Sequence, residues 1–459
     1  MKSGFTHKVN KEMGMIISDV RQSYSQQFGH AGLALIREMA RISGLDGMAQ
    51  KFSQEKQPQI TNDELLRALC GLLCQGKTDF DHIKEFKGDD FFQACLDLNR
   101  TPSAEILRQR FQKLSLHTSF ASKLPECSIN LWRSIGMQPE HIQREEQCWV
   151  RMDIDAVIFD NSDTQKEGAE YTYTSEFGFN PLFAHLGGGW MVNAQLRPGS
   201  AHSLASGTRQ FIFDSLDYGK QLVQDPLLLV MDSGFDSRDV ITSLVQTEDV
   251  DFIVKHNLRR ESGENWLQTA KDHQIEPEVV TTRTTRQNVY RGSISSSLSG
   301  PETPVRQVFE IKEITHRRGQ KLLIPEIKVF VVWTSLDLSA QDVLKLYRER
   351  GTSEQYHAEF KSEMDMQRFP SGKFQVNSAF LLLGMLVYNM LKAIGQDLVL
   401  AKAMGLKKAT RRRLKTVMRS MIFMCGKITR HARSIRLHLG CPTPWFRVFQ
   451  GLFRRLRAA

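Results

Sequence analysis

The run Pro226–Met231, with the sequence PLLLVM, constrains the fold more than any other stretch of the chain. A continuous apolar run of this length is typical of a strand that is covered on both faces, as in sheets flanked by helices. The run ends abruptly in Asp232, Ser233 and Gly234. Asp232 therefore follows the carboxyl end of a central strand, where open α/β sheets bind their ligands. An Asp-Ser-Gly turn is also a common way for a chain to leave a strand, so this position alone does not establish a site.

A second strand carries two carboxylates on one side. Trp149–Phe159 (WVRMDIDAVIF) alternates apolar and charged residues before it becomes fully apolar, which predicts a strand entering a core with Asp153 and Asp155 on the same face. Burying two carboxylates is costly unless positive charge lies beside them. A metal ion would compensate both charges, and so would Arg151 or a neighbouring basic residue. Local sequence leaves both explanations open.

The order of the remaining elements predicts an α/β domain with an insertion. Apolar periodicity indicates strands and helices in this order: strands at Tyr171–Phe183 and Gly189–Leu196, a helix at 203–223, the strand at Pro226–Met231, a helix at 236–247 and a strand at Asp251–Lys255. Residues 256–334 are rich in Thr, Val and Ser and predict a β-rich insertion, with a Ser/Gly/Pro connector at Gly292–Pro304.

The segment Leu344–Lys361 (LKLYRERGTSEQYHAEFK) combines one carboxylate with groups that bind phosphate. If the segment is one α-helix, four side chains fall within about 60° of a single stripe: Tyr347, Arg350, Glu354 and Lys361. A carboxylate can hold a divalent metal ion while the cations and the phenol bind phosphate oxygens. A solvated helix face is the alternative explanation. A cap at residues 351–353 would instead start the helix at about residue 352 and leave Tyr347 and Arg350 on the preceding turn.

Basic residues are concentrated after residue 391. Residues 391–459 hold 17 of the 61 Lys and Arg residues and a single acid, Asp397, so the net charge of +10 comes from this tail. Such a block is expected of a surface that binds a polyanion, with nucleic acid favoured over anionic membrane. The candidate DNA-binding residues of the tail are Lys407, Lys408, Arg411, Arg412, Arg413, Arg430 and Arg433. The spacing of Arg430, Arg433 and Arg436 predicts one basic ridge on a helix.

Other features favour a cytoplasmic protein. The seven cysteines are scattered and odd in number, which indicates reduced thiols, and the first residues lack the apolar segment of a secretion signal. Ala379–Leu391, the most apolar run, is too short to span a bilayer and predicts a buried core helix. Residues 1–145 predict a helical domain, which could bind a DNA end or be a plain helical bundle.

This order of elements is that of a ribonuclease H-like fold, in which the first and fourth strands are neighbours. Here the chain resembles bacterial insertion-sequence DDE transposases, specifically those with a Tyr-x2-Arg-x3-Glu-x6-Lys signature and a β insertion before the glutamate. The signature is met at Tyr347, Arg350, Glu354 and Lys361. The second family aspartate matches Asp232. The first is usually written Asp-x-Thr, whereas this chain has Asp155-Ala156-Val157, so Asp153 stays an alternative to Asp155.

The resemblance implies a domain layout: a helical domain at 1–145, a ribonuclease H-like catalytic domain at 146–255 and 335–395, a β-rich insertion at 256–334, and a basic helical region at 396–459. It also implies that Asp155, Asp232 and Glu354 are catalytic and hold two Mg²⁺ ions, with Mn²⁺ as a substitute. Tyr347, Arg350 and Lys361 would then hold phosphates at the transposon end.

The implied reaction is cut-and-paste transposition. A homodimer in the bacterial cytoplasm, associated with the nucleoid, would cleave the terminal inverted repeats of an insertion sequence and join them to target DNA. No membrane partner is expected. Two alternatives stay open: a ribonuclease H-like nuclease or resolvase that does not transfer strands, and a transposase-derived DNA-binding protein that is catalytically idle.

Overall fold

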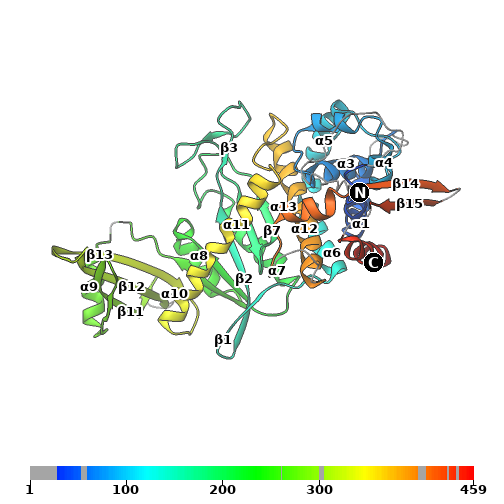
Figure 1. The fold of residues 1–459 in the computed structure, drawn as a ribbon. Coiled ribbons are helices and arrows are strands. Elements are labelled where there is room, and N and C mark those ends of the chain that lie inside the picture. Colours follow the sequence, from blue (N-terminus) through cyan, green and yellow to red (C-terminus); the bar gives the residue numbers. More distant parts are fainter. Residues whose placement is uncertain are drawn as a thin grey trace, which may run out of the picture.

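The computed structural model describes residues 28–52, 59–259, 261–298, 304–401, 410–431, 434–440 and 444–459. Helices from the first part of the chain lie beside the last helices and strands, a mixed sheet occupies the middle, and a β arm extends from the sheet on the side away from the helices (Figure 1). The α/β class predicted from the sequence is confirmed.

The central sheet places the predicted first and fourth strands side by side. Its five central strands are β2 (Gln147–Ala156), β6 (Leu182–Leu186), β7 (Trp190–Gln195), β8 (Leu227–Met231) and β9 (Val250–Lys255). They lie in the order β7-β6-β2-β8-β9. Strands β2, β8 and β9 are parallel to one another, and only β6 runs antiparallel, pairing with β2 on one side and β7 on the other. All residues of β8 are buried. The prediction of a central strand covered on both faces is therefore confirmed.

Alternate residues of β8 explain why the whole strand is apolar. Leu227, Leu229 and Met231 pack in the main core, where α7 (Thr208–Lys220) and α8 (Arg238–Val245) also contribute side chains. Leu228 and Val230 face the opposite way and pack against α10 (Ala340–Arg348). Helices thus cover both faces of the strand.

The predicted strand Tyr171–Phe183 is not continuous. A turn with Ser175 at φ 67° separates β4 (Glu170–Tyr171) from β5 (Phe177–Phe179), and these two strands form a small separate sheet with β3 (Phe159–Asp160). Only β6 of this stretch joins the central sheet. The interruption follows from a local hydrogen bond, because Thr172 N donates to Glu176 O across the turn.

The β arm is an extension of the central sheet. It consists of α9 (Gly263–Asp272), β10 (Glu278–Thr281), β11 (Thr285–Ser297), β12 (Pro304–Arg317) and β13 (Gln320–Thr334). β13 pairs with β9 through Val332 and Lys255, which makes the arm continuous with the sheet. The β-rich character predicted here is observed. The connector predicted at Gly292–Pro304 is wrong in part, because its first six residues belong to β11.

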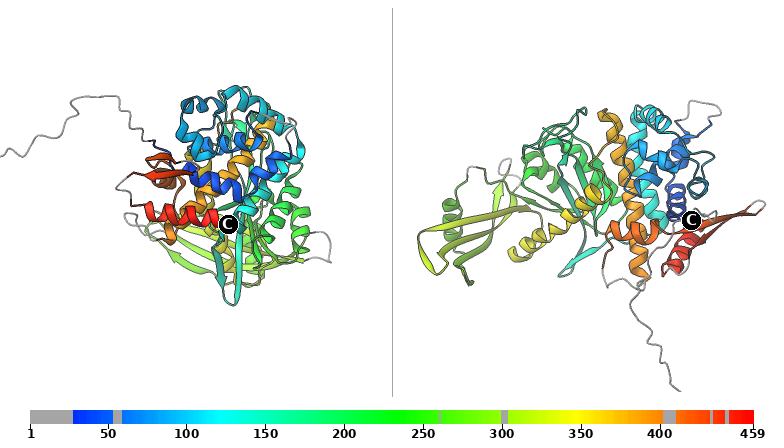
Figure 2. Two further views of the ribbon diagram at one scale, coloured as in Figure 1. Left: turned by 90° about the vertical axis from the view of Figure 1, so that its right-hand side faces the viewer. Right: turned by 45° about the horizontal axis from the view of Figure 1, so that its top comes forward.

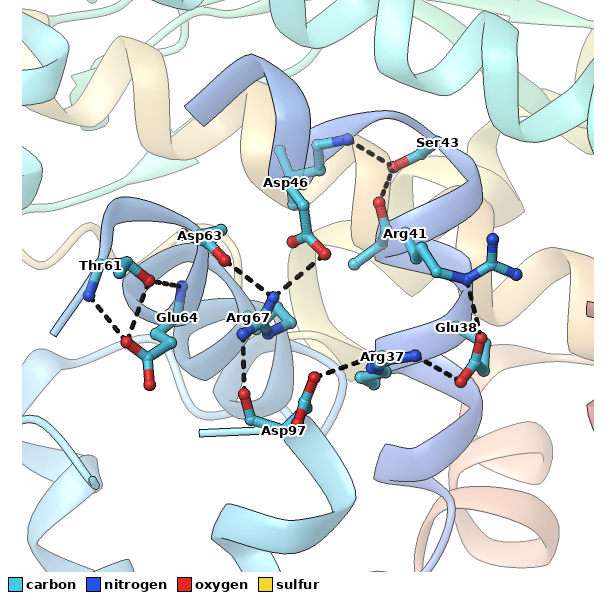
Figure 3. A network of polar contacts seen from close by, with 12 residues as sticks. Arg37, Glu38, Arg41, Ser43, Asp46, Thr61, Asp63, Glu64, Arg67 and Asp97 are labelled. Carbon is cyan, nitrogen blue, oxygen red and sulfur yellow. Dashed lines mark hydrogen bonds and ion pairs between the residues drawn. The ribbon is translucent and has the colours of Figure 1, made fainter. Parts of the chain in front are cut away.

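The helical layer surrounds a buried arginine. Its elements are α1 (Leu33–Ile42), α2 (Leu45–Gln50), α3 (Asn62–Leu73), the 3-10 helix η1 (Phe80–Phe86), α4 (Asp90–Leu96), α5 (Ala104–Ser115) and α6 (Thr118–Ile135), followed by β1 (His141–Arg144), which pairs with β2. Arg67 of α3 bonds Asp46 and Asp63 at 3.0 and 3.1 Å and donates to the carbonyl of Asp97 at 2.7 Å (Figure 3). One guanidinium therefore connects α2, α3 and the end of α4.

Helix α12 (Phe374–Leu400) joins the helical layer to the sheet. It extends well beyond the core helix predicted at Ala379–Leu391. The helix is long and apolar enough to cross a membrane, but 89% of its most apolar 18-residue segment is buried inside the protein. The amide of Asn389 accepts from Met191 N at 3.1 Å and donates to Met191 O at 2.8 Å, so the helix is fixed to the backbone of β7.

The C-terminal region is not wholly helical, which corrects the prediction for residues 396–459. Its elements after α12 are α13 (Leu414–Val417), the π-helix η5 (Met418–Ile422), the hairpin strands β14 (Gly426–His431) and β15 (Ser434–Leu439), and α14 (Phe446–Ala458). The predicted helical ridge of arginines is wrong. Arg430 pairs with Ile435 and Arg436 with Thr429, so the two arginines project from opposite faces of the hairpin. The hairpin packs beside the start of the helical layer, where Phe28 and Gly426 form a backbone bridge.

Candidate active site

Two aspartates lie together at the carboxyl edge of the central sheet. Ile154 of β2 is the parallel-strand partner of Met231 of β8, and the next residues along the two strands are Asp155 and Asp232. Neighbouring strands are about 4.8 Å apart, so the strand register itself places these two residues side by side. Asp232 leaves the sheet at this point, and its carboxylate accepts from Gly234 N at 2.8 Å.

A single arginine lies beside this pair and contacts Asp155. Nη2 of Arg350 lies 2.8 Å from Oδ2 of Asp155 and also donates to the carbonyl of Ile154 at 3.3 Å. The side chains of Arg350 and Asp155 are only 14% and 18% exposed. The ion pair is therefore largely shielded from water.

The charges of the site explain its perturbed pKa values. Burial raises the pKa of Asp155 to about 6, Arg350 opposes this rise, and the carboxylate of Asp232 adds to it. Burial alone would lower the pKa of Arg350, but the attraction of Asp155 and then Asp232 outweighs burial and raises it. Two carboxylates thus share one guanidinium. When both carboxylates are ionised, this group of three side chains has a net negative charge, which a bound cation would reduce.

Asp153 has a different environment. Arg151 forms a bidentate pair with it, with Nε and Nη2 2.8 to 3.0 Å from its carboxylate oxygens, and Nη1 of Arg151 donates to Leu346 O at 3.1 Å. This is the compensation by a neighbouring basic residue that the sequence left open. Of the two aspartates on β2, Asp155 is the one beside Asp232.

The predicted helical stripe at Leu344–Lys361 is wrong, because the helix is interrupted twice. α10 ends at Arg348, a 3-10 helix η3 covers Glu349–Thr352, α11 covers Ser353–Ala358, and a π-helix η4 covers Glu359–Glu363. The possible break near residue 352 is observed, although Tyr347 is still part of α10. Each change of helical period rotates the following side chains away from the stripe of a regular α-helix.

The four signature residues are consequently spread along the site. Tyr347 is partly buried against the ring of Phe330, and burial raises its pKa, an effect that the nearby positive charge of Arg350 opposes. Lys361 donates to the carbonyl of Ile158 at 2.8 Å, just beyond the end of β2. Glu354 is exposed in the first turn of α11, four residues after Arg350. The structure brings Tyr347 and Arg350 to the aspartates and leaves Glu354 at the surface.

The donor set fits a magnesium ion in part. Mg²⁺ is held in proteins by one or two carboxylates that leave positions for water and substrate phosphate, and Asp155 and Asp232 supply two such groups. Within the described ranges, no group of three or more His, Cys, Asp or Glu side chains is placed to hold one metal ion. Asp155 and Asp232 therefore fit a single cation, and Glu354 does not contribute to that pair in this structure.

Two arginines of the predicted basic tail form ion pairs within the protein. Arg411 pairs with Glu359, which is 1% exposed, and lies 4.8 Å from the ring centroid of Tyr356. Arg413 pairs with Glu363. Their charges compensate carboxylates of the π-helix η4.

The other predicted DNA contacts of the tail are distributed differently. Arg412 is partly buried, and Arg430 is exposed on β14. Lys407, Lys408 and Arg433 lie outside the described residues.

Sequence analysis did not find the role of Glu359 and Glu363. Beyond their arginine partners, Glu359 accepts from Leu414 N at 3.2 Å and Glu363 from Lys415 N at 2.7 Å, so both hold the start of α13. The signal was present, because two glutamates four residues apart lie on one face of a helix and match a basic segment elsewhere.

Two carboxylates at the ends of neighbouring parallel strands define a candidate cation site in an α/β protein. The chain belongs to the family described as transposase DDE domain group 1, whose model matches residues 25–459. Comparison with curated proteins finds no match. Among solved structures, the chain is similar to a piggyBac transposase synaptic complex with hairpin DNA, at 12% identity and a TM-score of 0.43, over 94% of this chain and 82% of that one.

Proposed function

We propose that this protein is the transposase of an insertion sequence, which cleaves the element ends and joins them to target DNA by a cut-and-paste reaction. The observation that carries the proposal is the register that sets Asp155 beside Asp232 on adjacent parallel strands. Family membership supports it. The strand order β7-β6-β2-β8-β9 also supports a ribonuclease H-like catalytic domain.

Asp155 and Asp232 would hold Mg²⁺, or Mn²⁺ in its place, and Glu354 would be the third catalytic carboxylate. When bound, the metal stabilises negative charge on the attacking and leaving oxygens of the phosphodiester. Glu354 is exposed, so its carboxylate is accessible from the surface beside Arg350. Asp155 must be ionised to act as a ligand, and its raised pKa means that ligand binding weakens below a pH of about 6.

The cations of the signature would hold the DNA. Arg350 lies against the aspartates, so its guanidinium can also reach a phosphate bound at the same edge. Tyr347 lies close enough to that guanidinium for the positive charge to oppose the rise of its pKa, and its phenol would bind phosphate beside it. Lys361 stands beyond the end of β2 and would bind a second phosphate. The partners would be the terminal inverted repeats and target DNA, bound by a homodimer in the cytoplasm.

The test compares carboxylate variants on DNA that carries the inverted repeats flanking the coding region. Asp155→Asn, Asp232→Asn and Glu354→Gln should each bind this DNA and fail to nick it in Mg²⁺. Asp239→Asn is the matched control, because Asp239 is an exposed acid on α8, and it should nick normally. Normal nicking by Asp155→Asn or Asp232→Asn would refute the assignment.

One observation favours a second candidate, a catalytically idle DNA-binding protein. Glu354 is apart from the two aspartates, and no three-carboxylate metal group occurs in the described part of the chain. Mg²⁺-dependent nicking by the wild-type protein would exclude this candidate. Nicking without strand joining would instead identify a nuclease or resolvase.

A further inference from the structure

The β arm leaves the central sheet at the carboxyl ends of its parallel strands. β13 pairs with β9 only at its last residues, and Val332 lies opposite Lys255, the final residue of β9. From Val332 back to Gln320, β13 therefore continues past the carboxyl edge of the sheet, the edge at which Asp155 and Asp232 lie. The arm extends well clear of the rest of the molecule (Figure 2).

The arm tip, defined as residues 282–286, 316–325 and Lys328, carries a concentrated positive charge. Arg318 N donates to Thr284 O, so the β10–β11 turn and the β12–β13 turn lie together. The exposed cations of the tip are Arg283, Arg286, Arg317, Arg318, Lys321 and Lys328. Glu326 pairs with Arg317 at 2.6 Å and with Lys328 at 3.4 Å. The other four cations have no carboxylate partner among the described residues.

An apolar pair lies within this charged surface. Leu323 is 99% exposed and Ile324 is 80% exposed, and the exposed Pro325 follows them. No core cluster of the described residues includes either side chain. Two adjacent large apolar side chains that are this exposed near the end of the arm indicate a contact surface.

We propose that the arm tip binds duplex DNA about one helical turn away from the phosphodiester at Asp155 and Asp232. The unpaired cations contact the sugar-phosphate backbone, and Leu323 and Ile324 enter the minor groove between them. The inference rests on the proposed function in one respect, that DNA lies at the two aspartates.

The reach of the arm matches the repeat of DNA. Val308 of β12 lies opposite Val332, and Arg317 of β12 lies opposite Gln320 at the tip. These two residues are nine positions apart on β12, and an antiparallel strand rises about 3.4 Å per residue, which gives about 30 Å. One turn of B-DNA is about 34–36 Å. A duplex that runs from the aspartates along the arm therefore presents the same groove face again close to the tip.

The composition of the tip fits a groove better than a protein surface. Protein interfaces exclude charge from their centres and bury about 800 Å² per partner, whereas this tip has two apolar side chains surrounded by cations. Minor-groove proteins combine the two chemistries in this way, with Arg and Lys on the backbone and Leu, Ile or Pro wedged against base steps. Duplex DNA offers phosphates to the cations and a minor groove to the two apolar side chains, so it matches both features of the tip.

The first experiment measures affinity and its salt dependence in full-length protein carrying Asp155→Asn, on a 40-base-pair duplex. The triple variant Arg286→Ser/Arg318→Ser/Lys321→Ser loses up to three phosphate contacts. The slope of log K against log salt is negative, and it should become shallower by about 2 to 3, at about 0.9 for each lost contact. Leu323→Ser/Ile324→Ser should weaken binding and leave the slope unchanged. The matched control, Lys220→Ser/Lys271→Ser/Lys373→Ser, removes three exposed lysines outside the arm tip and should change neither value.

The second experiment locates the contact. In the wild-type background, a hydroxyl-radical footprint on nicked DNA should show protection about 10 base pairs from the nick, and the tip variants should lose only this protection. Unchanged thermal unfolding of both variants would show that the fold is intact.

Three outcomes are distinguishable. An unchanged salt slope and footprint in the tip variants overturn the tip proposal, while loss of nicking in Asp155→Asn still upholds the proposed function. Normal nicking by Asp155→Asn refutes the proposed function and leaves the slope test of the tip valid. Sedimentation of DNA-free protein that shows a dimer for wild type and a monomer for Leu323→Ser/Ile324→Ser assigns the tip to a protein interface and overturns the proposal.

Discussion

Replacing Arg350 by alanine tests the electrostatic logic of the site directly. Arg350 is the cation that contacts Asp155, whose pKa burial and Asp232 already raise to about 6. Without the guanidinium, the repulsion from Asp232 is no longer opposed at short range. The pKa of Asp155 should therefore rise further.

The size of this rise follows from the geometry. A cation beside a carboxylate lowers its pKa by about 1 to 3 units, so its removal should return a shift of that size. Both side chains are less than 20% exposed, so solvent screening reduces the effect little. The change corresponds to about 1.4 to 4 kcal/mol between the two protonation states.

Stability should respond with a definite sign. A carboxyl group whose folded pKa lies above the ordinary value of 3.8 binds its proton more tightly when folded, so its contribution to stability falls as pH rises through that window. For Asp155 in wild type the fall should end near pH 6. In Arg350→Ala it should continue to a pH about 1 to 3 units higher.

The assay is calorimetric titration of the protein with Mn²⁺ from pH 5 to 8. Wild-type affinity should fall about tenfold per unit below a pH of about 6, because Asp155 must lose its proton to bind the ion. In Arg350→Ala the fall should begin at higher pH, and Arg350→Lys, which keeps the charge, should resemble wild type. The same midpoint in Arg350→Ala and wild type would refute the reasoning.

Three further changes probe the structure around the site. Asn389→Leu should lower the stability to chemical unfolding by about 2 to 5 kcal/mol, because it leaves the backbone N–H and C=O of Met191 buried without partners. Lys392→Met should remove a rise of thermal stability between pH 7 and 10, because burial, with Arg411 nearby, lowers the pKa of Lys392 to about 7 and the unfolded chain binds more protons in that range. Glu359→Gln should destabilise the protein by about 3 to 5 kcal/mol in chemical unfolding, because it leaves Arg411 without its buried partner.

Each of these has a result that would count against it. Equal stability of Asn389→Leu and wild type would show that water replaces the amide. A stability profile unchanged by Lys392→Met would mean that the lysine is charged in the folded state near neutral pH. Glu363→Gln is the matched control for Glu359→Gln and should have a smaller effect, because its partner Arg413 is 65% exposed.

The central strand of the sheet could be predicted from the sequence because all of its residues are apolar. PLLLVM has no polar residue that could face water, so it had to be a covered strand, and Asp232 had to follow it. The pairing of β2 with β8 then followed from the order of elements. The choice of Asp155 over Asp153 did not, because it depends on where the guanidinium of Arg151 lies.

The departures have physical causes that composition does not reveal. The helix after Leu344 changes to a 3-10 and then a π period, and residue types scarcely distinguish these from an α-helix. The arginines of the C-terminal hairpin have a spacing of three that suits a helix. The alternation in Ser434–Leu439 (SIRLHL) was the better signal, since period two indicates a strand.

The contacts between the start and the end of the chain, such as the backbone bridge between Phe28 and Gly426, affect folding during translation. Helix α1 packs against α14, so its apolar side chains lack part of their cover until residues near 450 have been translated. Domains usually fold as units while the chain leaves the ribosome. The helical layer can complete its packing against α14 only after the last residues have been translated. We expect nascent chains stalled before residue 420 to leave the helical layer open to proteases, a vulnerability that the released protein does not share.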